Sequence, residues 1–447
     1  MAQQINGPGH KVITKQRYFM RKHDTTEVLV VGAGPVGMFT ALKLAKSGIG
    51  VRLIDQESCT AGRSYACALH PRTIQLLDEV GVAGDAIKLG YPIENAAFFE
   101  GAQQHAELEL SRLPVEFPYV LVLEQKFLED LLEQKLKSAG VEVQWNHRLS
   151  DMTMKGGGVD ATIEKLGLDA KGYVVPDFEM AVKKVISTRA DFVVGADGQR
   201  SSVRRLLDIN YRRMGEPQLF VVYEFETETK LPAEIRIALG QNTTAVLWPF
   251  SERKGRWSFQ WPQADAPADF TQKDRNAYNI VDSPGPEDSR HHLQKLLRAH
   301  APWFQHKIKE VGWATDIQFE QRLAQEFGRN RAWLAGDAAH QTGPVGMQSM
   351  NAGFREGADL ATKLTGTLRQ RNLPDLLEAY NFEHRAEWEK LLGGKVVSQT
   401  ISPADPWVRE HGARLTACIP STGRNLRLLL KQLGLEFETA DREEVVV

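Results

Sequence analysis

A glycine-rich turn between two short β-strands constrains the fold of this chain more than any other feature. The stretch EVLVVGAGPVGMFTALKLAKSGIGVRLIDQ (residues 27–56) contains a run of β-formers, a glycine turn, a helix to about Ser47 and a second strand that closes on an acid. A dinucleotide-binding fold requires its elements in that order. The sequence therefore predicts a Rossmann-like α/β domain that binds a dinucleotide.

The residues of this turn have separate physical tasks. The first glycine makes the tight turn, the second lets the backbone approach a pyrophosphate, and the third lets the helix pack closely on the strand. The start of the helix offers free N–H groups to the phosphates, and the acid can accept a hydrogen bond from a ribose. The motif does not distinguish FAD from NAD. Its predicted cofactor contacts are Gly32, Gly34, Pro35, Val36, Gly37, Asp55 and Gln56.

Composition excludes several classes of protein. The length of 447 residues suggests two or three domains at about 150 residues each. The net charge of −2 leaves no basic surface for a nucleic acid. Three scattered cysteines without a C-x-x-C pair argue against a disulfide framework or a zinc site, and they favour the cytoplasm. We find no apolar run long enough for a membrane span and no signal peptide.

The character of the chain changes along its length. Helices are expected at residues 72–79 and 126–139, and residues 143–194 read as a β-meander of short strands. From about residue 212 to 320, alternating strands at 223–229, 244–250 and 256–262 predict an antiparallel sheet inserted into the nucleotide domain. A last amphipathic helix at residues 423–434 carries a leucine-rich face, which we expect to dock on the body of the protein rather than on a membrane.

Two further motifs place an acid at the end of an apolar strand. In GADGQRSSVRRLL (residues 195–207), Asp197 can either hold a ligand or cap the following helix. In WLAGDAAHQTGPVGMQSMNAGFREGADLATKL (residues 333–364), Asp337 can either hold a sugar-like hydroxyl or act as a cap. A helix from about Asn351 would point its N-terminus back at the loop, and a helix N-terminus stabilises a group that becomes anionic.

Together and in this order, these three motifs resemble the single-component FAD-dependent monooxygenases of the aromatic-hydroxylase type, which share the para-hydroxybenzoate hydroxylase-like fold. The segment GRSYACALHPRTIQLLDEVG (62–81) is similar to the family's segment with an arginine beside the flavin, here Arg63. VLEQKFLEDLL (122–132) resembles the segment whose glutamine faces the cofactor, here Gln125, and GRWSFQW (255–261) resembles a strand of the substrate sheet. The resemblance covers roughly residues 27–393.

The resemblance implies FAD as the cofactor. Asp337 would meet the ribityl chain, the loop at residues 344–346 would lie against the isoalloxazine ring, and the helix after it would face the pyrimidine edge. The family carries glycine where this chain has Met347 and Ser349, which bears on how the flavin moves. The further cofactor contacts that the resemblance implies are Arg63, Gln125, Asp197, Asp337, Pro344, Gly346, Met347 and Gln348.

The expected domains follow from the same resemblance. The FAD-binding domain comprises residues 25–95, 122–205 and 318–395, and the substrate-binding domain comprises residues 96–121 and 206–317. An N-terminal arm (1–24) precedes them, and a C-terminal helical extension (396–447) follows.

The activity that the resemblance implies is a hydroxylation. NADPH or NADH would reduce FAD, O2 would add to the reduced ring, and the flavin hydroperoxide would pass one oxygen to a small aromatic or conjugated substrate. No residue is assigned as a catalytic base and no metal is expected. We expect His70 and His340, which lie inside the motifs, to be packing or hydrogen-bonding residues.

Two alternating patterns in the expected substrate domain have competing interpretations. Trp257, Phe259 and Trp261 share one face of a strand. They form either an aromatic wall for a flat substrate or a core that buries the sheet against helices. The glutamates at 224, 226 and 228 also alternate, and we expect a solvated face.

Other functions remain open on the sequence alone. The same fold can perform epoxidation or Baeyer–Villiger oxidation, whereas halogenation is disfavoured because RWSFQWP does not match the W-x-W-x-I-P stretch of flavin halogenases. A non-oxygenating flavoprotein would reduce FAD without yielding an oxygenated product. A binding protein of this architecture would contain no flavin.

Overall fold

A mainly parallel β-sheet forms the centre of the part of the molecule that contains the glycine turn. Its strands are β1 (Asp24–Val31), β2 (Val51–Ile54), β8 (Val143–Gln144), β9 (His147–Lys155), β10 (Gly158–Lys171), β11 (Asp177–Gly195), β19 (Gly328–Arg329) and β20 (Ala332–Leu334). Their order is β19-β20-β11-β1-β2-β8, and β10 and β9 extend the sheet from β11. The pairs β1–β2, β1–β11, β11–β20 and β2–β8 are parallel, as a dinucleotide fold requires.

The structure is a computed structural model that describes residues 24–60, 66–171, 177–262, 286–370 and 374–438. The N-terminal arm expected at residues 1–24 lies outside this range except for Asp24, which begins β1.

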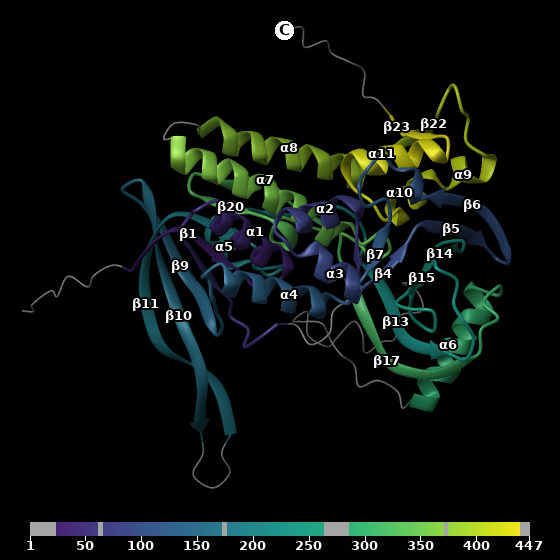
Figure 1. Cartoon of the computed structure of the whole chain (residues 1–447), viewed down its shortest axis with the longest axis horizontal. Helices are drawn as coiled ribbons and strands as arrows, with labels where there is room; N and C mark the ends of the chain where they lie inside the picture. Colours follow the sequence, from purple (N-terminus) through teal and green to yellow (C-terminus); the bar gives the residue numbers. More distant parts are fainter. Residues whose placement is uncertain (1–23, 61–65, 172–176, 263–285, 371–373, 439–447) are drawn as a thin grey trace, which may run out of the picture.

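The meander between residues 147 and 195 differs from the expected short strands. β10 has 14 residues and β11 has 19. The two strands pair with each other from Val159 opposite Ala190 to Lys171 opposite Asp177, beyond the point where their other neighbours end. This long hairpin projects from the body of the molecule (Figure 1). Mutual pairing satisfies one edge of each strand, so the hairpin extends without a third strand.

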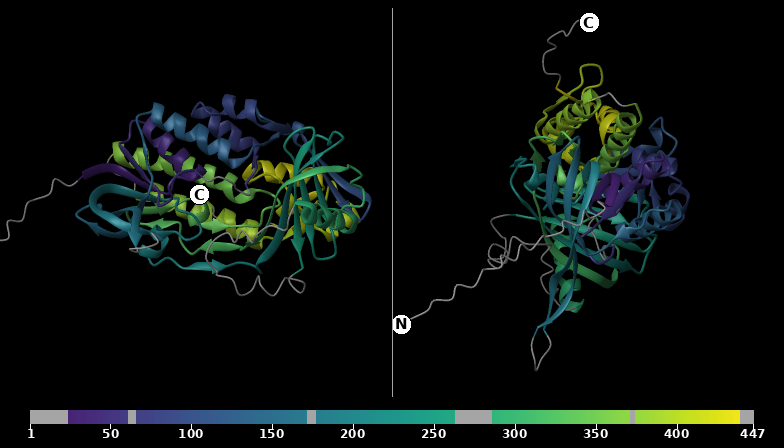
Figure 2. Two further views of the ribbon diagram at one scale, coloured as in Figure 1. Left: turned by 90° about the horizontal axis from the view of Figure 1, so that it is seen from below. Right: turned by 90° about the vertical axis from the view of Figure 1, so that its left-hand side faces the viewer.

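Helices pack on this sheet and on one another. They are α1 (Pro35–Lys46), α2 (Pro71–Glu79), α3 (Ala83–Leu89), α4 (Gln125–Ser138), α5 (Ser202–Leu206), η4 (Gly336–Ala338), α7 (Gln348–Gln370) and α8 (Pro374–Gly393). α1 contacts β1, β2, α4 and α7, and α7 contacts α8. The further views show α7 and α8 running side by side (Figure 2). α7 begins one turn before the start expected near Asn351.

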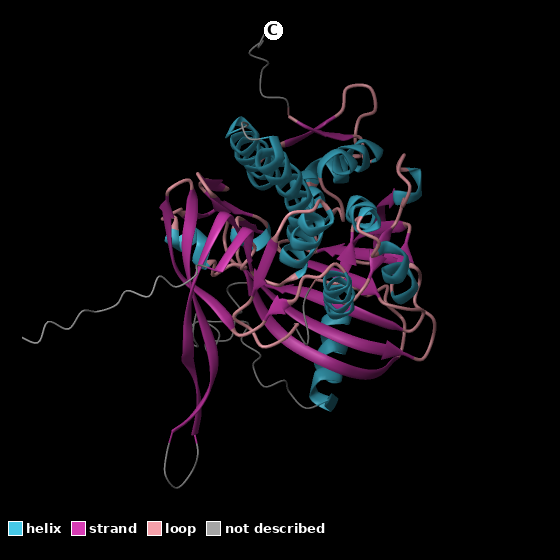
Figure 3. Ribbon diagram, turned by 60° about the vertical axis from the view of Figure 1, so that its left-hand side comes forward, coloured by secondary structure: helices cyan, strands magenta, loops and turns pink. Residues whose placement is uncertain are grey.

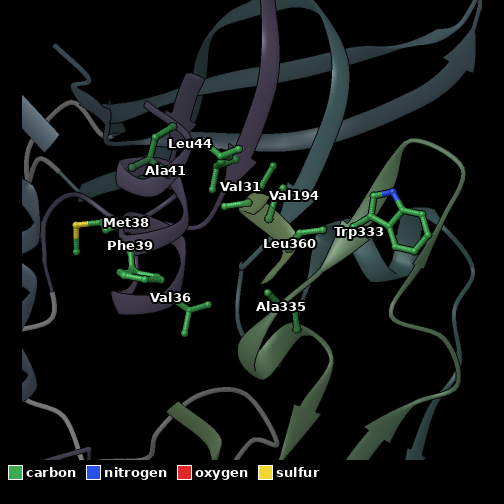
Figure 4. Close-up of a cluster of buried hydrophobic side chains, with 14 of the residues drawn as sticks. Val31, Val36, Met38, Phe39, Ala41, Leu44, Val194, Trp333, Ala335 and Leu360 are labelled. Atoms are coloured by element: carbon green, nitrogen blue, oxygen red, sulfur yellow. The ribbon is translucent and has the colours of Figure 1, made fainter. Parts of the chain in front are cut away.

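The largest apolar core lies where these elements meet. Val31 from β1, Phe39 from α1, Val194 from β11, Trp333 from β20 and Leu360 from α7 belong to one buried cluster (Figure 4). All five side chains are at most 5% exposed. The core therefore fixes the ends of β1, β11 and β20. The glycine turn follows β1, and Asp197 and Asp337 follow β11 and β20.

A seven-stranded sheet forms the second part of the molecule. Its strands are β5 (Asn95–Glu100), β6 (Gln103–Glu109), β13 (Gln218–Thr227), β14 (Glu234–Leu239), β15 (Thr244–Pro249), β16 (Lys254–Trp261) and β17 (Ile308–Phe319). Their order is β17-β13-β16-β15-β14-β5-β6. The sheet is antiparallel except for the parallel pair β14–β5, where the chain returns to the sheet after a long excursion. α6 (Pro286–His300) lies across one of its faces (Figure 3).

The C-terminal extension packs against the body, as expected. It contains α9 (Pro406–Glu410), α10 (Gly412–Cys418) and α11 (Gly423–Gln432), together with a strand pair, β22 (Val396–Ser398) and β23 (Leu435–Phe437), that the sequence did not predict. Leu426, Leu429 and Leu430 of α11 are at most 3% exposed and belong to the same buried cluster as β5 and β14. In the described ranges, no helix has the length and apolar character that crossing a membrane needs.

Short elements connect the two parts. One small sheet contains β3 (Ala68–Leu69), β7 (Val120–Val122) and β4 (Tyr91–Ile93), with the 3-10 helix η1 (Leu110–Arg112) nearby. The other contains β12 (Tyr211–Arg213), β18 (Arg322–Ala324) and β21 (His340–Gln341). In the second sheet, β21 begins at the last residue of the GDAAH stretch, and β12 is the strand that precedes β13 of the seven-stranded sheet along the chain.

Candidate active site

The three motifs of the sequence (residues 27–56, 195–207 and 333–364) meet at the glycine turn, and each contains an acid that follows a strand. A Cβ atom on Gly32 would lie 2.2 Å from the carbonyl oxygen of Ala196, next to Asp197. On the other side, Cβ atoms on Gly336 and Gly353 would lie 3.2 and 2.7 Å from the Val36 side chain. Segments far apart in the sequence therefore touch, and they do so at positions where only glycine fits.

The three glycines of the first motif occupy the positions that their tasks require. Gly32 has φ = +104°, a conformation that side chains rarely adopt. A Cβ on Gly37 would lie 1.9 Å from the Gly32 carbonyl oxygen, so the helix approaches the turn as closely as a backbone can. A Cβ on Gly34 would meet no described atom within 4 Å. The backbone there faces open space in which a pyrophosphate could lie.

Asp55 supports the glycine turn directly. Its Oδ2 accepts a hydrogen bond from the backbone N–H of Ala33 at 2.5 Å, and its Oδ1 accepts one from Glu57 at 2.8 Å. An ionised carboxylate has about four acceptor positions. The remaining positions are available for a ribose hydroxyl, so both roles fit together. The neighbouring Gln56 is exposed.

One carboxylate oxygen of Asp197 binds the start of a helix, and the other has no partner. Its Oδ2 accepts hydrogen bonds from the N–H groups of Ser202 and Val203 at 2.6 and 3.2 Å, at the start of α5. Its Oδ1 is buried and has no hydrogen-bond partner in the structure. Burial raises the pKa of Asp197, and the hydrogen bonds from Ser201 and from the N–H groups oppose that rise. The N-cap residue of α5 is Ser201, whose hydroxyl accepts from Arg204 N–H, and Asp197 satisfies two further N–H groups of the same helix start; Oδ1 is left for a ligand.

Asp337 lies at the end of β20, where the resemblance implies the ribityl chain. Its Oδ1 accepts a hydrogen bond from the Ser349 hydroxyl at 3.2 Å, and its backbone carbonyl accepts one from the Tyr211 hydroxyl at 3.1 Å. Burial raises the pKa of Asp337, whereas His340 and Ser349 lower it. As a whole residue, Asp337 is partly exposed.

A buried pair behind Asp337 was not expected from the sequence. Glu356 is 1% exposed; its Oε2 lies 2.8 Å from His340 Nε2 and accepts from Gly336 N–H at 2.9 Å. Its Oε1 accepts from the Trp388 indole at 2.8 Å. Burial alone would raise the pKa of Glu356, but His340 and Trp388 lower it to about 2. The expectation that His340 is a hydrogen-bonding residue is confirmed, and its partner comes from one face of α7.

The loop expected against the flavin ring is fastened from the side of α2. The His70 ring Nε2 lies 2.9 Å from the carbonyl oxygen of Gly346. The Asn351 amide donates to the carbonyls of Ala68 and Met347 and accepts from the His70 backbone N–H. Burial lowers the pKa of His70 to about 3, so this ring stays neutral. The expected hydrogen-bonding role of His70 is thereby confirmed.

The same loop is fastened from the C-terminal extension. The Gln348 side-chain amide donates to the carbonyls of Thr416 and Ile419 at 3.1 and 3.4 Å, and it is 4% exposed. A Cβ on Gly346 would lie 2.6 Å from the carbonyl oxygen of Ala417. The side chain of Gln348 therefore binds the extension, which leaves only its backbone for the cofactor contact expected from the sequence.

Met347 adopts a backbone conformation that suits the glycine of the family pattern. Its φ is +49°, in the left-handed region. Its side chain is 7% exposed and belongs to a buried cluster with Val345, Cys418 and Ile419. The conformational cost of a side chain at this position is offset by apolar burial against the C-terminal extension. Pro344, which begins the loop, is also buried.

Two other predicted cofactor contacts have different outcomes. The Gln125 amide donates to the buried Glu129 carboxylate at 2.6 Å, one turn further along α4. Gln125 itself is half-buried at the start of that helix. Arg63 lies outside the described residues.

The aromatic residues of β16 face away from this loop. Trp257 and Phe259 are at most 1% exposed and pack with Leu293, Leu297 and Phe304 on the α6 side of the sheet. Trp261 lies on the same side, 5.6 Å from the His292 ring of α6. The burial of Trp257 and Phe259 favours the hydrophobic-core interpretation over the aromatic wall for these two residues. Helix α6 covers this face because its apolar stripe needs a partner.

The opposite face of the same sheet turns toward the loop. Its buried residues form one cluster with Val345 and Met347 of the loop. The residues that the sheet contributes to this cluster are Ala96, Phe98, Leu108, Phe220, Val222, Ile235, Ile237, Leu239, Val246, Trp248, Trp313 and Ile317. We name this surface the loop-side face.

The loop-side face carries a buried ion pair that the sequence analysis missed. Arg256 Nη2 lies 2.5 Å from Glu224 Oε1, and the two side chains are 3% and 15% exposed. The guanidinium also lies 5.1 and 5.6 Å from the ring centres of Phe250 and Trp313. Cys67 lies nearby; burial raises the pKa of its thiol to about 11, although Arg256 opposes the rise.

The expectation of a solvated glutamate face is wrong for Glu224. It holds for Glu226 and Glu228, which pair with Lys309 and Lys307 on the surface. Alternation places Arg256 on the face of β16 opposite Trp257 and Phe259, but it does not distinguish Glu224 from Glu226 and Glu228.

These residues fit a bound FAD. Gly34 opens on free space, and the first turn of α1 contains no acid and receives no hydrogen bond from a described capping side chain. Its N–H groups are thus available to a diphosphate. Asp197 Oδ1 and Gln341 Oε1 are buried acceptors without partners, as expected where a hydroxyl-bearing ligand would complete the bonding.

Comparison with known proteins agrees with this geometry. The family model described as "FAD binding domain" matches residues 25–393. The chain belongs to this family. The resemblance drawn from the motifs is thereby confirmed, and the relatives of this FAD-binding chain include several aromatic-compound monooxygenases.

Two curated relatives illustrate the likeness. The chain is 28% identical over 382 residues to "6-methylpretetramide 4-monooxygenase" of Streptomyces rimosus, which covers 84% of this chain and 61% of that protein. It is 26% identical over 402 residues to "Pentachlorophenol 4-monooxygenase" of Sphingobium chlorophenolicum, covering 88% and 67%. The chain therefore spans about two thirds of the length of these relatives.

A solved structure shows the same fold over nearly the whole chain. The p-nitrophenol 4-monooxygenase PnpA from Pseudomonas putida DLL-E4 superposes with a TM-score of 0.66 at 22% identity. The match covers 92% of this chain and 97% of that one. The α/β fold with an inserted sheet, expected from the sequence, is confirmed.

Proposed function

We propose that the protein is an FAD-dependent monooxygenase that consumes NAD(P)H and O2 and hydroxylates a small aromatic or conjugated substrate. The observation that carries the proposal is the meeting of three acidic motifs at one glycine turn, beside a loop that faces the loop-side face of the second sheet. The names of the relatives support the reaction class.

The residues that would hold FAD follow the order of the motifs. The glycine turn and the N-terminus of α1 would bind the diphosphate, and Asp55 would bind the adjoining ribose. Asp337 would meet the ribityl chain, and the backbone of residues 344–348 would support the ring. Arg63 and Gln125 are further proposed contacts of the ring.

Bound FAD would supply hydride acceptance from NAD(P)H and the activation of O2, which protein side chains cannot carry. The chain's own contribution is to orient the substrate and exclude water. The apolar residues of the loop-side face provide a dry surface, and Arg256 is the buried cation on it. An aromatic substrate could stack on such a surface and place an anionic or phenolic oxygen near Arg256.

The cellular setting proposed from the sequence is the cytoplasm. Cys59, Cys67 and Cys418 are all free thiols in the structure, and this supports a reducing environment. Fractionation of cells that express the tagged protein tests the location.

An absorption spectrum of the purified protein tests the proposal first. We expect a flavin spectrum that bleaches anaerobically with NADPH or NADH and returns when air is admitted. A panel of phenols and polycyclic aromatics then identifies compounds that accelerate the bleaching. Mass spectrometry under 18O2 should show one labelled oxygen atom in the product.

Other outcomes would select the alternative functions. A protein that takes up no added FAD would refute the enzyme and favour a binding protein. Bleaching with no labelled product from any panel compound would favour a non-oxygenating flavoprotein. A labelled epoxide or lactone would retain the monooxygenase and change the reaction to epoxidation or Baeyer–Villiger oxidation.

A further inference from the structure

The Ser349 hydroxyl lies between the side chains of Asp337 and His340. Its oxygen is 3.2 Å from Asp337 Oδ1 and 3.3 Å from His340 Nδ1. Ser349 is the second residue of α7, whereas Asp337 lies in η4 after β20. The glycine of the family pattern has no hydroxyl, so these contacts are a property of this chain.

The His340 ring cannot turn to another arrangement. Its side chain and that of Glu356 are 0% and 1% exposed, and the ring stacks on Trp388 with centres 3.9 Å apart. The Glu356 carboxylate accepts hydrogen bonds from Gly336 N–H and the Trp388 indole. Because an ionised carboxylate only accepts, the proton between Glu356 and His340 belongs to Nε2. Nδ1 therefore faces Ser349 in a fixed position.

The single proton of the Ser349 hydroxyl decides what Asp337 receives. The Ser349 hydroxyl donates this proton to Asp337 Oδ1 at 3.2 Å, and its oxygen lies 3.3 Å from His340 Nδ1. A hydrogen bond to an ionised acceptor is about twice as strong as a neutral one. The carboxylate is then held at Oδ1, and its other acceptor positions remain for a ligand.

We propose that Ser349 is a positioning residue for the cofactor, which fixes the Asp337 carboxylate so that it accepts a hydrogen bond from the ribityl chain of FAD. The buried Glu356–His340 pair holds the imidazole ring that lies 3.3 Å from this hydroxyl. The inference rests on the proposed function, because it takes Asp337 as a contact of FAD.

The test measures FAD affinity of the apoprotein by flavin fluorescence, and needs no substrate. Ser349→Ala should weaken FAD binding about tenfold, which corresponds to about 1.4 kcal/mol. Ser349→Thr, which keeps the hydroxyl, should bind within about twofold of the wild type. Thr365→Ala is the matched control, because it removes a hydroxyl from the same helix that donates only to Ala361 O; it too should stay within about twofold.

A double-mutant cycle separates a positioning role from a structural one. In the Asp337→Ala background, Ser349→Ala should weaken FAD binding no further, because the carboxylate that it orients is gone. Urea unfolding of the single variants should give the same midpoint for Ser349→Ala and Thr365→Ala. Such a result shows that the loss of affinity does not come from a damaged fold.

Three results would overturn the inference. They are an unchanged FAD affinity in Ser349→Ala, a Thr variant as weak as the Ala variant, and an undiminished effect of Ser349→Ala in the Asp337→Ala background. An Asp337→Ala variant that binds FAD like the wild type would also overturn it, while leaving the proposed monooxygenase intact. Failure of the wild type to bind FAD would instead refute the proposed function.

Discussion

Replacement of Glu224 by glutamine isolates the energy of the buried charge pair on the loop-side face. Glu224 and Glu226 are two residues apart on β13, and each pairs with one cation at 2.5 and 3.2 Å. Burial distinguishes them. The pair of Glu224 with Arg256 is 15% and 3% exposed, whereas the pair of Glu226 with Lys309 is 47% and 61% exposed.

The expected magnitudes follow from this difference in exposure. Removal of one partner from a buried pair costs about 3–5 kcal/mol, because the other charge stays buried without its counter-ion. Glutamine keeps one acceptor for the guanidinium, so we expect about 3 kcal/mol for Glu224→Gln. An exposed pair contributes about 0–1 kcal/mol. We therefore expect at most about 0.5 kcal/mol for Glu226→Gln.

Urea unfolding of the holoprotein, followed by tryptophan fluorescence, measures both variants. With a slope of about 2–3 kcal/mol per molar urea, Glu224→Gln should lower the midpoint by about 1–1.5 M and the control by less than about 0.3 M. Equal shifts for the two variants would refute the argument that burial sets the energy of the pair. A changed slope would show instead that the two parts of the molecule unfold separately.

Three further predictions concern the loop and the sheet. Met347→Gly relieves a positive φ, which costs about 1 kcal/mol, but deletes a buried side chain that contributes about 2–5 kcal/mol. We therefore expect the free energy of unfolding, measured in urea, to fall by about 1–4 kcal/mol. A rise in this free energy would contradict the prediction. His70 has a folded pKa of about 3 against about 6.5 in the unfolded chain, so the unfolded state binds its proton first as the pH falls. The contribution of His70 to the free energy of unfolding should therefore be fully present above about pH 6.5 and fall toward pH 3 by up to about 1.4 kcal/mol per pH unit. His70→Gln should make the free energy of unfolding depend less steeply on pH between about pH 7 and 5. The same dependence in wild type and variant would contradict this prediction. Trp257→Phe should lower the unfolding midpoint and leave the acceleration of flavin bleaching by an active panel compound within about twofold, because the ring belongs to the core with α6. An unchanged midpoint with a lost acceleration would restore the substrate wall.

The cofactor motifs could be located in the sequence because their physics is local. The positive φ of Gly32 and the hydrogen bond from Ala33 to Asp55 follow from the spacing of a strand, a turn and a second strand. Asp55, Asp197 and Asp337 likewise each follow the end of an apolar strand. Contacts across the fold were not visible in this way. Glu356, for example, lies in the middle of a helix, and its partners His340 and Trp388 come from other elements.

Side-chain alternation determined which residues share a face, but not what each face would meet. Trp257, Phe259 and Trp261 do lie on one side of β16, yet only the packing of α6 decided that this side is core. In the same way, three glutamates of one strand were read as a solvated set, although Glu224 is buried with Arg256. A strand specifies its two faces by its own geometry, whereas the neighbour that covers each face comes from distant parts of the chain. The sequence therefore determined the cofactor fold and its acids, and the tertiary structure decided which charges are buried beside them.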